Sequence, residues 1–278
     1  MTYLLGIDGG GTACRASLVG PDGDVLGMGQ AGPANVATTV SGAIASVLAA
    51  ARAALDAAGL DLDCGDLKTG LGLAGANAAG VETALANALP FRRMRITTDA
   101  TTAAMGALGR DDGIVAAIGT GSVFVAQRGG HLRQVGGWGL ALGDEGSGAR
   151  MGRTLLACVV KMADGRLPAT PLLAAVLQDM GSTAEIVSFA TRATPADFAA
   201  LAPRVLQAED PAAEDIRRAF AQEVAEIIAF LQPDPPLPVV FLGGLGAFYQ
   251  QRLDGRWQVH PARGSALDGA LVLAAEVA

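Results

Sequence analysis

Short apolar runs alternate along the first part of the chain with longer segments in which apolar positions recur at helical spacing. The short runs predict strands and the longer segments predict amphipathic helices. The predicted strands of this part lie at 3–7, 13–19, 23–29, 68–75 and 94–98. The predicted helices lie at 38–58, 81–89 and 101–108. A meander followed by strands that alternate with helices predicts an α/β fold with a partly parallel sheet.

At Gly113 the pattern begins again with a strand, a glycine turn and a second strand. Helices are predicted after it at 147–161, 172–180, 183–191, 195–207 and 212–231, then a strand at 238–244 and a last helix at 265–277. Internal similarity of this kind predicts two related domains. We expect one at 1–112 and one at 113–278, the second with a helical insert, and a last helix that packs back on the first.

Both strand–turn–strand units carry glycines and a hydroxyl residue at the turn. Ile7-Asp8-Gly9-Gly10-Gly11-Thr12 in the first corresponds to Ile118-Gly119-Thr120-Gly121-Ser122 in the second. One glycine loop alone fits a wide, flexible turn as well as a phosphate loop. Two together favour phosphate binding through bare backbone N–H groups, with the hydroxyls of Thr12, Thr120 and Ser122 as further donors.

Two carboxylates lie where ligands bind in such sheets. Asp8 directly precedes the first loop, and its side chain suits Mg²⁺ or, alternatively, caps the glycine turn. Asp99 follows the predicted strand 94–98 and begins a helix, at the sheet edge where open α/β sheets place ligands. Position alone favours a helix N-cap for Asp99, and a general base for an attacking hydroxyl is the functional alternative.

The segment from Gly136 to Gly146 holds five glycines interrupted by Trp138, Asp144 and Glu145. Such a segment is not a regular helix, and it predicts a shaped loop that offers an aromatic face and carboxylates to a polar small molecule. The alternative for Trp138 is a place in the core.

The composition is that of a folded globular protein, with 51% hydrophobic and 17% charged residues among 278. A net charge of -7 and 20 scattered Lys and Arg make nucleic acid an unexpected partner. The apolar stretch at 42–60 is rich in alanine and contains Arg52 and Asp56, unlike a membrane span. With no signal-type segment at the N-terminus and three dispersed cysteines, we expect a cytoplasmic protein without disulfides or a zinc site.

Eight motifs occur here in the order found in the BadF/BadG/BcrA/BcrD-type ATPase and N-acetylglucosamine kinase family, and the chain resembles its short bacterial glucosamine kinases. The motifs are GIDGGGTACRASLV, GPANVATT, LGLAGA, TTDATTAAMGA, IGTGS, GGWGLALGDEGSGARMG, FLGGLG and SALDGALVLA. The resemblance spans nearly the whole chain and is weakest in the helical insert, at about 167–231.

The resemblance implies the actin-like ATPase fold, with two ribonuclease-H-like domains, a central cleft and a helical insert in the second domain. It implies that ATP is bound by Gly10, Gly11, Thr12, Gly119, Thr120, Gly121, Ser122, Gly243 and Gly244. By the same carry-over, Asp8 positions Mg²⁺ and Asp99 becomes the catalytic base, in place of a cap alone. Asn35, Asp99, Thr120, Trp138 and Asp144 match positions around the sugar.

We therefore expect an ATP- and Mg²⁺-dependent hexosamine kinase, a homodimer whose partners are ATP and a small amino sugar, with no membrane or nucleic acid. Glucosamine is favoured over N-acetylglucosamine by overall similarity, because both kinds of kinase share the Gly-Asp-Glu-Gly segment. Relatives that activate radical enzymes bind an iron–sulfur cluster through cysteines. This chain has no cysteine between Val123 and Gly146, which disfavours that alternative.

Overall fold

The computed structural model describes residues 2–78 and 80–278. These residues form two compact units. Unit 1 comprises Met1–Gly113, Val125–Arg133 and Pro261–Ala278, and unit 2 comprises Ile114–Phe124 and Gln134–His260. The end of the chain thus belongs to the same unit as its beginning. The contiguous domain limits predicted from the sequence, 1–112 and 113–278, stay a prediction.

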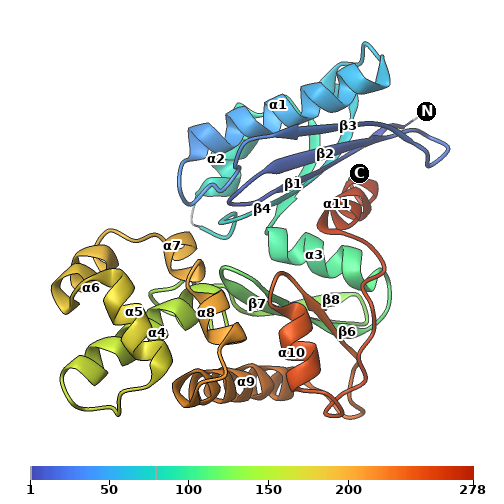
Figure 1. The fold of residues 1–278 in the computed structure, drawn as a ribbon. Coiled ribbons are helices and arrows are strands. Elements are labelled where there is room, and N and C mark those ends of the chain that lie inside the picture. Colours follow the sequence, from blue (N-terminus) through green and yellow to red (C-terminus); the bar gives the residue numbers. More distant parts are fainter. Residues whose placement is uncertain (1, 79) are drawn as a thin grey trace. The chain divides into compact units, whose positions relative to one another are not determined.

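A five-stranded mixed sheet forms the centre of unit 1 (Figure 1). Its strands are β1 (Leu4–Gly9), β2 (Cys14–Val19), β3 (Val25–Ala31), β4 (Lys68–Leu73) and β5 (Arg93–Thr97), in the order β3-β2-β1-β4-β5. The β1–β2 and β2–β3 pairs are antiparallel, whereas β1–β4 and β4–β5 are parallel. The carboxyl ends of β1, β4 and β5 therefore meet at one edge of the sheet, where Asp8 lies.

Helices cover both faces of this sheet. They are α1 (Val40–Ala58), α2 (Val81–Ala88), α3 (Asp99–Leu108) and α11 (Ala266–Ala275), with a short 3₁₀ helix at Cys64–Asp66. Glycines in the strands let the helices approach. A Cβ on Gly29 would lie 2.0 Å from the Ala50 carbonyl oxygen of α1, and one on Gly70 would lie 2.1 Å from the Ala270 carbonyl oxygen of α11. The last helix packs on β1, β4 and α3, within unit 1.

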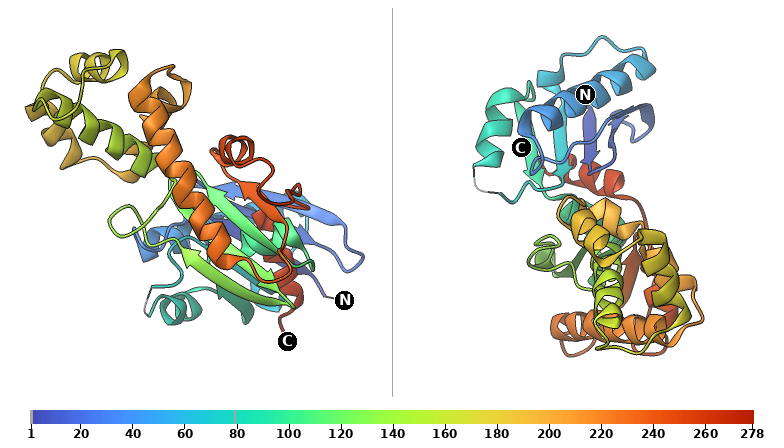
Figure 2. Two further views of the ribbon diagram at one scale, coloured as in Figure 1. Left: turned by 90° about the horizontal axis from the view of Figure 1, so that it is seen from below. Right: turned by 60° about the vertical axis from the view of Figure 1, so that its left-hand side comes forward.

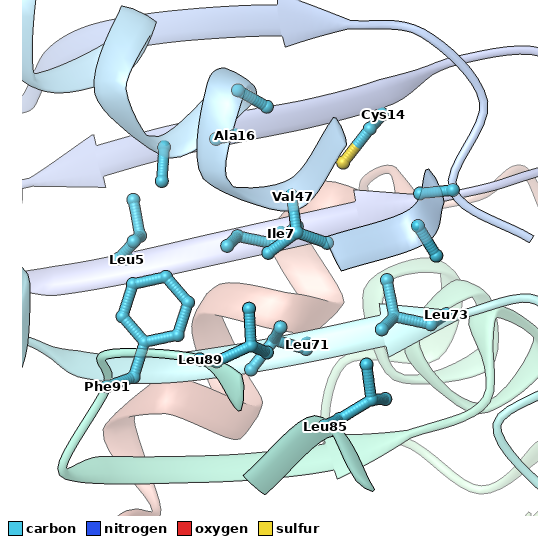
Figure 3. Packing of buried hydrophobic residues seen from close by; sticks show 14 of the residues in the cluster. Leu5, Ile7, Cys14, Ala16, Val47, Leu71, Leu73, Leu85, Leu89 and Phe91 are labelled. Atoms are coloured by element: carbon cyan, nitrogen blue, oxygen red, sulfur yellow. The ribbon is translucent and has the colours of Figure 1, made fainter. Parts of the chain in front are cut away.

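The main core of unit 1 lies between the sheet and helices α1 and α2 (Figure 3). Leu5, Ile7 and Val47 are fully buried in it. Cys14 is buried among them, and burial raises the pKa of its thiol to about 12, so this cysteine is a small apolar residue of the core. By length and composition alone α1 could cross a membrane, but its buried side packs on β3 as the helix of a folded core does.

Unit 2 contains most of a second, four-stranded sheet. Its strands are β6 (Gly113–Ile118), β7 (Ser122–Arg128), β8 (His131–Gly136) and β9 (Val239–Leu242), in the order β8-β7-β6-β9. Strands β6 and β9 are parallel, so their carboxyl ends, at Ile118 and Leu242, lie next to each other. Helix α10 (Gly246–Arg252) follows β9 and packs against it.

The helical insert follows β8, and Figure 2 shows its helices. The insert has a hydrophobic core of its own. Its helices are α4 (Gly148–Ala163), α5 (Pro171–Met180), α6 (Thr183–Ala190), α7 (Pro195–Ala199), α8 (Ala202–Gln207) and α9 (Pro211–Leu231). The single helix predicted for 195–207 is wrong, because the structure breaks it into α7 and α8. Pro203 explains the break: proline fits the first turn of a helix but disrupts the interior.

Candidate active site

The first glycine loop connects β1 to β2 as a tight turn with an open tip. The Gly10 N–H donates to the Ala13 carbonyl (2.9 Å), and the Gly10 carbonyl accepts from the Ala34 N–H (2.9 Å). Gly11 and Thr12 are exposed, and within the described part of the chain no hydrogen bond engages their N–H groups. These N–H groups are available to an anion, as the phosphate-loop hypothesis requires.

Asp8 is directly opposite Arg15 in the β1–β2 hairpin. The Arg15 guanidinium donates to Asp8 Oδ2 at 2.7 Å, and Asp8 is only 7% exposed. The carboxylate therefore forms an ion pair beside the loop. Among the described residues no N–H of the glycine turn donates to it, so the alternative in which Asp8 caps the turn is wrong. The sequence did hold a signal for this pair, because two residues that flank a hairpin loop symmetrically face each other across the strands.

Asp99 is the first residue of α3, and the N-cap predicted for it belongs to Thr98. The Thr98 hydroxyl accepts from the Thr101 N–H at 3.2 Å, which fixes the start of the helix. Asp99 Oδ1 accepts from the Ala100 N–H (2.9 Å), and the Thr102 hydroxyl donates to the Asp99 carbonyl (3.0 Å). No Lys, Arg or His among the described residues pairs with this carboxylate.

Burial raises the pKa of Asp99 above its ordinary value, and the negative charge of Asp8 raises it further. A half-buried carboxyl with a raised pKa and no basic partner is suited to accept a proton. Among the residues that the structure describes, no three His, Cys, Asp or Glu side chains gather as a metal site. Asp8 nevertheless fits Mg²⁺, which commonly uses one or two carboxylates and takes its other ligands from water and phosphates.

The second glycine loop, between β6 and β7 in unit 2, is fastened to the segment that begins α4. The Gly148 N–H donates to the Gly119 carbonyl (2.8 Å) and the Ala149 N–H to the Thr120 carbonyl (3.1 Å). Ser122 is buried, and its hydroxyl donates to the Glu145 carbonyl at 2.7 Å. The Ser122 hydroxyl therefore has a partner inside the protein, while Thr120 is exposed at the tip of the loop.

Asp144 meets this loop from the glycine-rich segment 136–146. It is 5% exposed, and its carboxylate is so close to Gly121 that a Cβ on Gly121 would lie 3.2 Å from Asp144 Oδ2. Its φ of 61° is positive, a conformation that asparagine and aspartate tolerate better than most residues. Burial raises the pKa of Asp144, a hydrogen bond from the Ser122 N–H opposes this, and Glu145 raises the pKa further.

Trp138 lies earlier in the same segment and is 64% exposed. The alternative that placed it in the core is therefore wrong. Leu142, four residues later, is 84% exposed. Exposed apolar side chains on a glycine-rich loop are available to contact a ligand.

The remaining predicted residues lie at loops of both units. In unit 1, Asn35 Oδ1 accepts from the Ala37 N–H (2.9 Å), and the intervening Val36 N–H donates to the Ala74 carbonyl (3.0 Å) at the end of β4. In unit 2, Gly243 has a φ of 83°, and a Cβ there would lie 2.4 Å from the Ile118 carbonyl oxygen. Gly244 has open space where a side chain would be.

Unit 1 thus supplies Asp8, the open loop Gly10–Thr12, Asn35 and Asp99. Unit 2 brings together the second loop, Asp144 and the glycines after β9. Sequence reasoning missed Arg15 and, in unit 2, Tyr249, whose hydroxyl donates to the Gly146 carbonyl at 2.5 Å. Tyr249 follows the FLGGLG motif closely, but no local pattern could reveal a partner 103 residues away.

Comparisons with known proteins show the family and the fold of the chain. A model of the BadF/BadG/BcrA/BcrD ATPase family matches residues 5–246. The chain is 32% identical to the glucosamine kinase GspK of Vibrio cholerae over 99% of this chain and 96% of that protein. It is 29% identical to the N-acetylmuramic acid/N-acetylglucosamine kinase of Clostridium acetobutylicum over 60% of this chain and 56% of the other.

Among solved structures, a Chromobacterium violaceum protein assigned provisionally as an N-acetylglucosamine kinase has a TM-score of 0.89 and 35% identity, with 99% of each chain covered. A glucokinase of the ROK family from Streptomyces griseus, solved with glucose and AMPPNP, has a TM-score of 0.57 at 19% identity and 99% coverage of each chain, and shares the fold. The predicted α/β fold of the actin-like ATPase type is confirmed.

Proposed function

This chain belongs to the BadF/BadG/BcrA/BcrD ATPase family, and from that premise we propose that it transfers the γ-phosphoryl group of ATP to the 6-hydroxyl of glucosamine. The observation that carries the proposal is Asp99, a half-buried carboxylate at the sheet edge with a raised pKa and no basic partner in the described chain. Full-length similarity to the Vibrio cholerae glucosamine kinase supports the amino sugar as acceptor.

Asp99 is the general base of this reaction. It accepts the proton of the 6-hydroxyl as the sugar oxygen bonds to the γ-phosphorus and the bond from that phosphorus to the bridging oxygen breaks, so that ADP leaves. The N–H groups of Gly11, Thr12 and the second loop bind the phosphates, with the Thr120 hydroxyl as a further donor. Asp8 would hold Mg²⁺ directly or through water, and an ion bound there would supply charge neutralisation for the phosphates.

The sugar is held by Asn35, Trp138 and Asp144 in this proposal. Asp144 accepts hydrogen bonds from sugar hydroxyls, and Trp138 offers an exposed ring face. Glu145, beside Asp144, is a second carboxylate for a 2-ammonium group, but its Oε1 lies 3.7 Å from the Arg150 guanidinium. The preference for glucosamine therefore rests on similarity to the Vibrio cholerae protein more than on this carboxylate.

N-acetylglucosamine is the second candidate acceptor, favoured by the likeness to the Chromobacterium violaceum protein. The deciding measurement compares kcat/KM for glucosamine, N-acetylglucosamine and glucose in one coupled ADP assay. Glucosamine should be the best substrate. A preference of tenfold or more for N-acetylglucosamine, about 1.4 kcal/mol in transition-state stabilisation, would reassign the acceptor and keep the kinase.

The proposal includes a cytoplasmic homodimer that uses no nucleic-acid or membrane partner. Sedimentation equilibrium of the full chain tests the dimer. A non-kinase ATPase activator is the remaining alternative, and it requires an iron–sulfur cluster. An absorption band of such a cluster in anaerobically purified protein, together with no phosphorylation of any amino sugar, would replace the kinase proposal.

A further inference from the structure

Tyr249 is a fully buried tyrosine in unit 2 whose hydroxyl reaches one backbone carbonyl. It lies in the first turn of α10 and donates to the Gly146 carbonyl at 2.5 Å. The site described above gives this residue no role. Burial raises the pKa of Tyr249 well above its ordinary value, so the hydroxyl keeps its proton and remains a donor.

The Gly146 carbonyl is one of three consecutive carbonyls that are each held by a different partner. The Asp144 carbonyl accepts from the Ser147 N–H (3.0 Å), and the Glu145 carbonyl accepts from the Ser122 hydroxyl (2.7 Å). The positive φ of Asp144 costs on the order of 1 kcal/mol and persists only where the surroundings determine it. These bonds therefore position the Asp144 carboxylate.

The segment just before α10 is attached to the second glycine loop. The Leu245 N–H donates to the Ile118 carbonyl (3.0 Å), the residue before Gly119. Gly243 packs on the same carbonyl, where any Cβ would clash at 2.4 Å. A closed circuit thus runs from the second loop to residues 243–245, along α10 to Tyr249, and through 144–146 back to Ser122.

We propose that Tyr249 is a positioning residue that couples nucleotide binding to sugar binding, by linking the segment 243–246 to the backbone beside Asp144. This inference rests on the proposed function, in which the second loop binds ATP and Asp144 binds the sugar, and on the family resemblance, which implies that Gly243 and Gly244 bind the nucleotide. A nucleotide on residues 243–244 orders the start of α10. The helix is rigid over one turn, so the Tyr249 hydroxyl holds the Gly146 carbonyl, and with it Asp144, in the sugar-binding conformation.

The test measures glucosamine binding by calorimetry with the full chain and Mg²⁺, in the absence and presence of AMPPNP. In the wild type AMPPNP should tighten glucosamine about tenfold, within the usual range for coupled sites. Tyr249→Phe keeps the ring and removes the hydroxyl. It should reduce this coupling to about twofold or less, while AMPPNP alone binds within twofold of wild type. If Tyr249 had a merely structural role, Tyr249→Phe would lower the affinity for both glucosamine and AMPPNP, or for neither.

Tyr3→Phe is the matched control, because Tyr3 is the other tyrosine of the chain and lies in unit 1. It should leave the coupling unchanged. If Tyr249→Phe does not fold, as judged by near-ultraviolet circular dichroism, Ser122→Ala removes the other side-chain bond of the circuit and should reduce the coupling in the same way.

Two results contradict the inference alone: a wild type that phosphorylates glucosamine but binds it equally well with and without AMPPNP, or a folded Tyr249→Phe protein with full coupling. A wild type that neither binds nor phosphorylates glucosamine or N-acetylglucosamine contradicts the proposed function and this inference with it.

Discussion

The two glycine loops look alike in sequence but differ in how the protein holds them. At the first, between β1 and β2, the exposed residues Gly11 and Thr12 have no hydrogen-bond partner among the described residues. At the second, the loop accepts bonds from the N–H groups of Gly148 and Ala149, and the Ser122 hydroxyl donates to the Glu145 carbonyl.

The difference shows that the same glycine motif can form either an adaptable loop or a loop held in place by its surroundings. The first loop can adapt to a ligand because, among the residues that the structure describes, only Ala13 and Ala34 form backbone hydrogen bonds with its tip. The second loop is an integral part of unit 2, so its shape also fixes the backbone beside Asp144. We therefore expect mutations at the first loop to affect ligand binding alone, and mutations at the second loop to affect stability as well.

The largest effect should come from Asp99, the base that belongs to the unit of the open loop. Asp99→Asn removes the proton acceptor without touching either loop, so kcat should fall by about 10²–10⁴-fold. ATP affinity, measured by calorimetry, should stay within about twofold of wild type.

Asp22→Asn is a suitable control for this variant, because Asp22 is an exposed turn residue of the same unit. It should leave kcat unchanged. Near-normal turnover of Asp99→Asn would refute the assignment of the base.

A valine at equivalent glycines of the two loops compares them directly. At Gly121 a Cβ would lie 3.2 Å from Asp144 Oδ2, whereas at Gly11 nothing lies within 4 Å. Gly121→Val should lower the free energy of unfolding by about 2 kcal/mol and weaken ATP binding, because the side chain displaces Asp144 and crowds the loop. Gly11→Val should change the free energy of unfolding by no more than about 0.5 kcal/mol.

Urea unfolding measures the free energy of unfolding of both variants, and ATP titration of the folded proteins measures their ATP affinity. Equal losses of stability at Gly11 and Gly121 would remove the contrast between the loops. Normal ATP binding by Gly121→Val would show that the second loop does not contact phosphate.

Local patterns in the sequence predicted most of the fold and the positions of both loops. Apolar periodicity located the strands, and glycine next to a strand end located the turns. The break inside 195–207 was missed although Pro203 signals it, since helical periodicity continued across the proline. Thr98 was not predicted as the N-cap because Asp99 beside it is the more favoured capping residue type.

The contacts that hold the second loop could not be predicted in this way. Ser122 and Glu145 are separated by 23 residues, and Tyr249 and Gly146 by 103, so each bond depends on the tertiary fold. The hydroxyl of Ser122 resembled that of Thr12 in sequence, and its buried position and its bond to the Glu145 carbonyl show that it faces the protein instead of a ligand.

Asp144 should show a trade-off between stability and binding. Its folded-state pKa is raised by burial, so the stability that its protonated form contributes is present at low pH and is lost as the pH rises through the folded pKa. Asparagine does not ionise, so Asp144→Asn removes this loss of stability at higher pH. Asparagine also tolerates the positive φ at this position. At pH 7 the variant should melt at a higher temperature than wild type, and glucosamine affinity should fall on the order of tenfold.

Thermal unfolding of both proteins from pH 4 to 8 checks the sign. The stability difference in favour of Asp144→Asn should grow as the pH rises above the ordinary aspartate range. A difference that is constant over this range, or that favours wild type at pH 8, would show that burial of the charge at Asp144 does not cost stability.

The smallest contrast concerns the hydroxyls of the two loops. Ser122→Ala removes a buried hydrogen bond of 2.7 Å and leaves the Glu145 carbonyl without that donor, so the free energy of unfolding should fall by about 1 kcal/mol. Thr12→Ala removes an exposed hydroxyl with no partner in the described chain, so the free energy of unfolding should stay within about 0.5 kcal/mol of wild type. Urea unfolding without ligand measures both values.

The same measurement in the presence of ATP tests the hydroxyl of the first loop. If the Thr12 hydroxyl contacts phosphate, ATP should stabilise Thr12→Ala less than it stabilises the wild type. Equal stability of the two ligand-free variants would mean that the second loop is no more firmly held than the first.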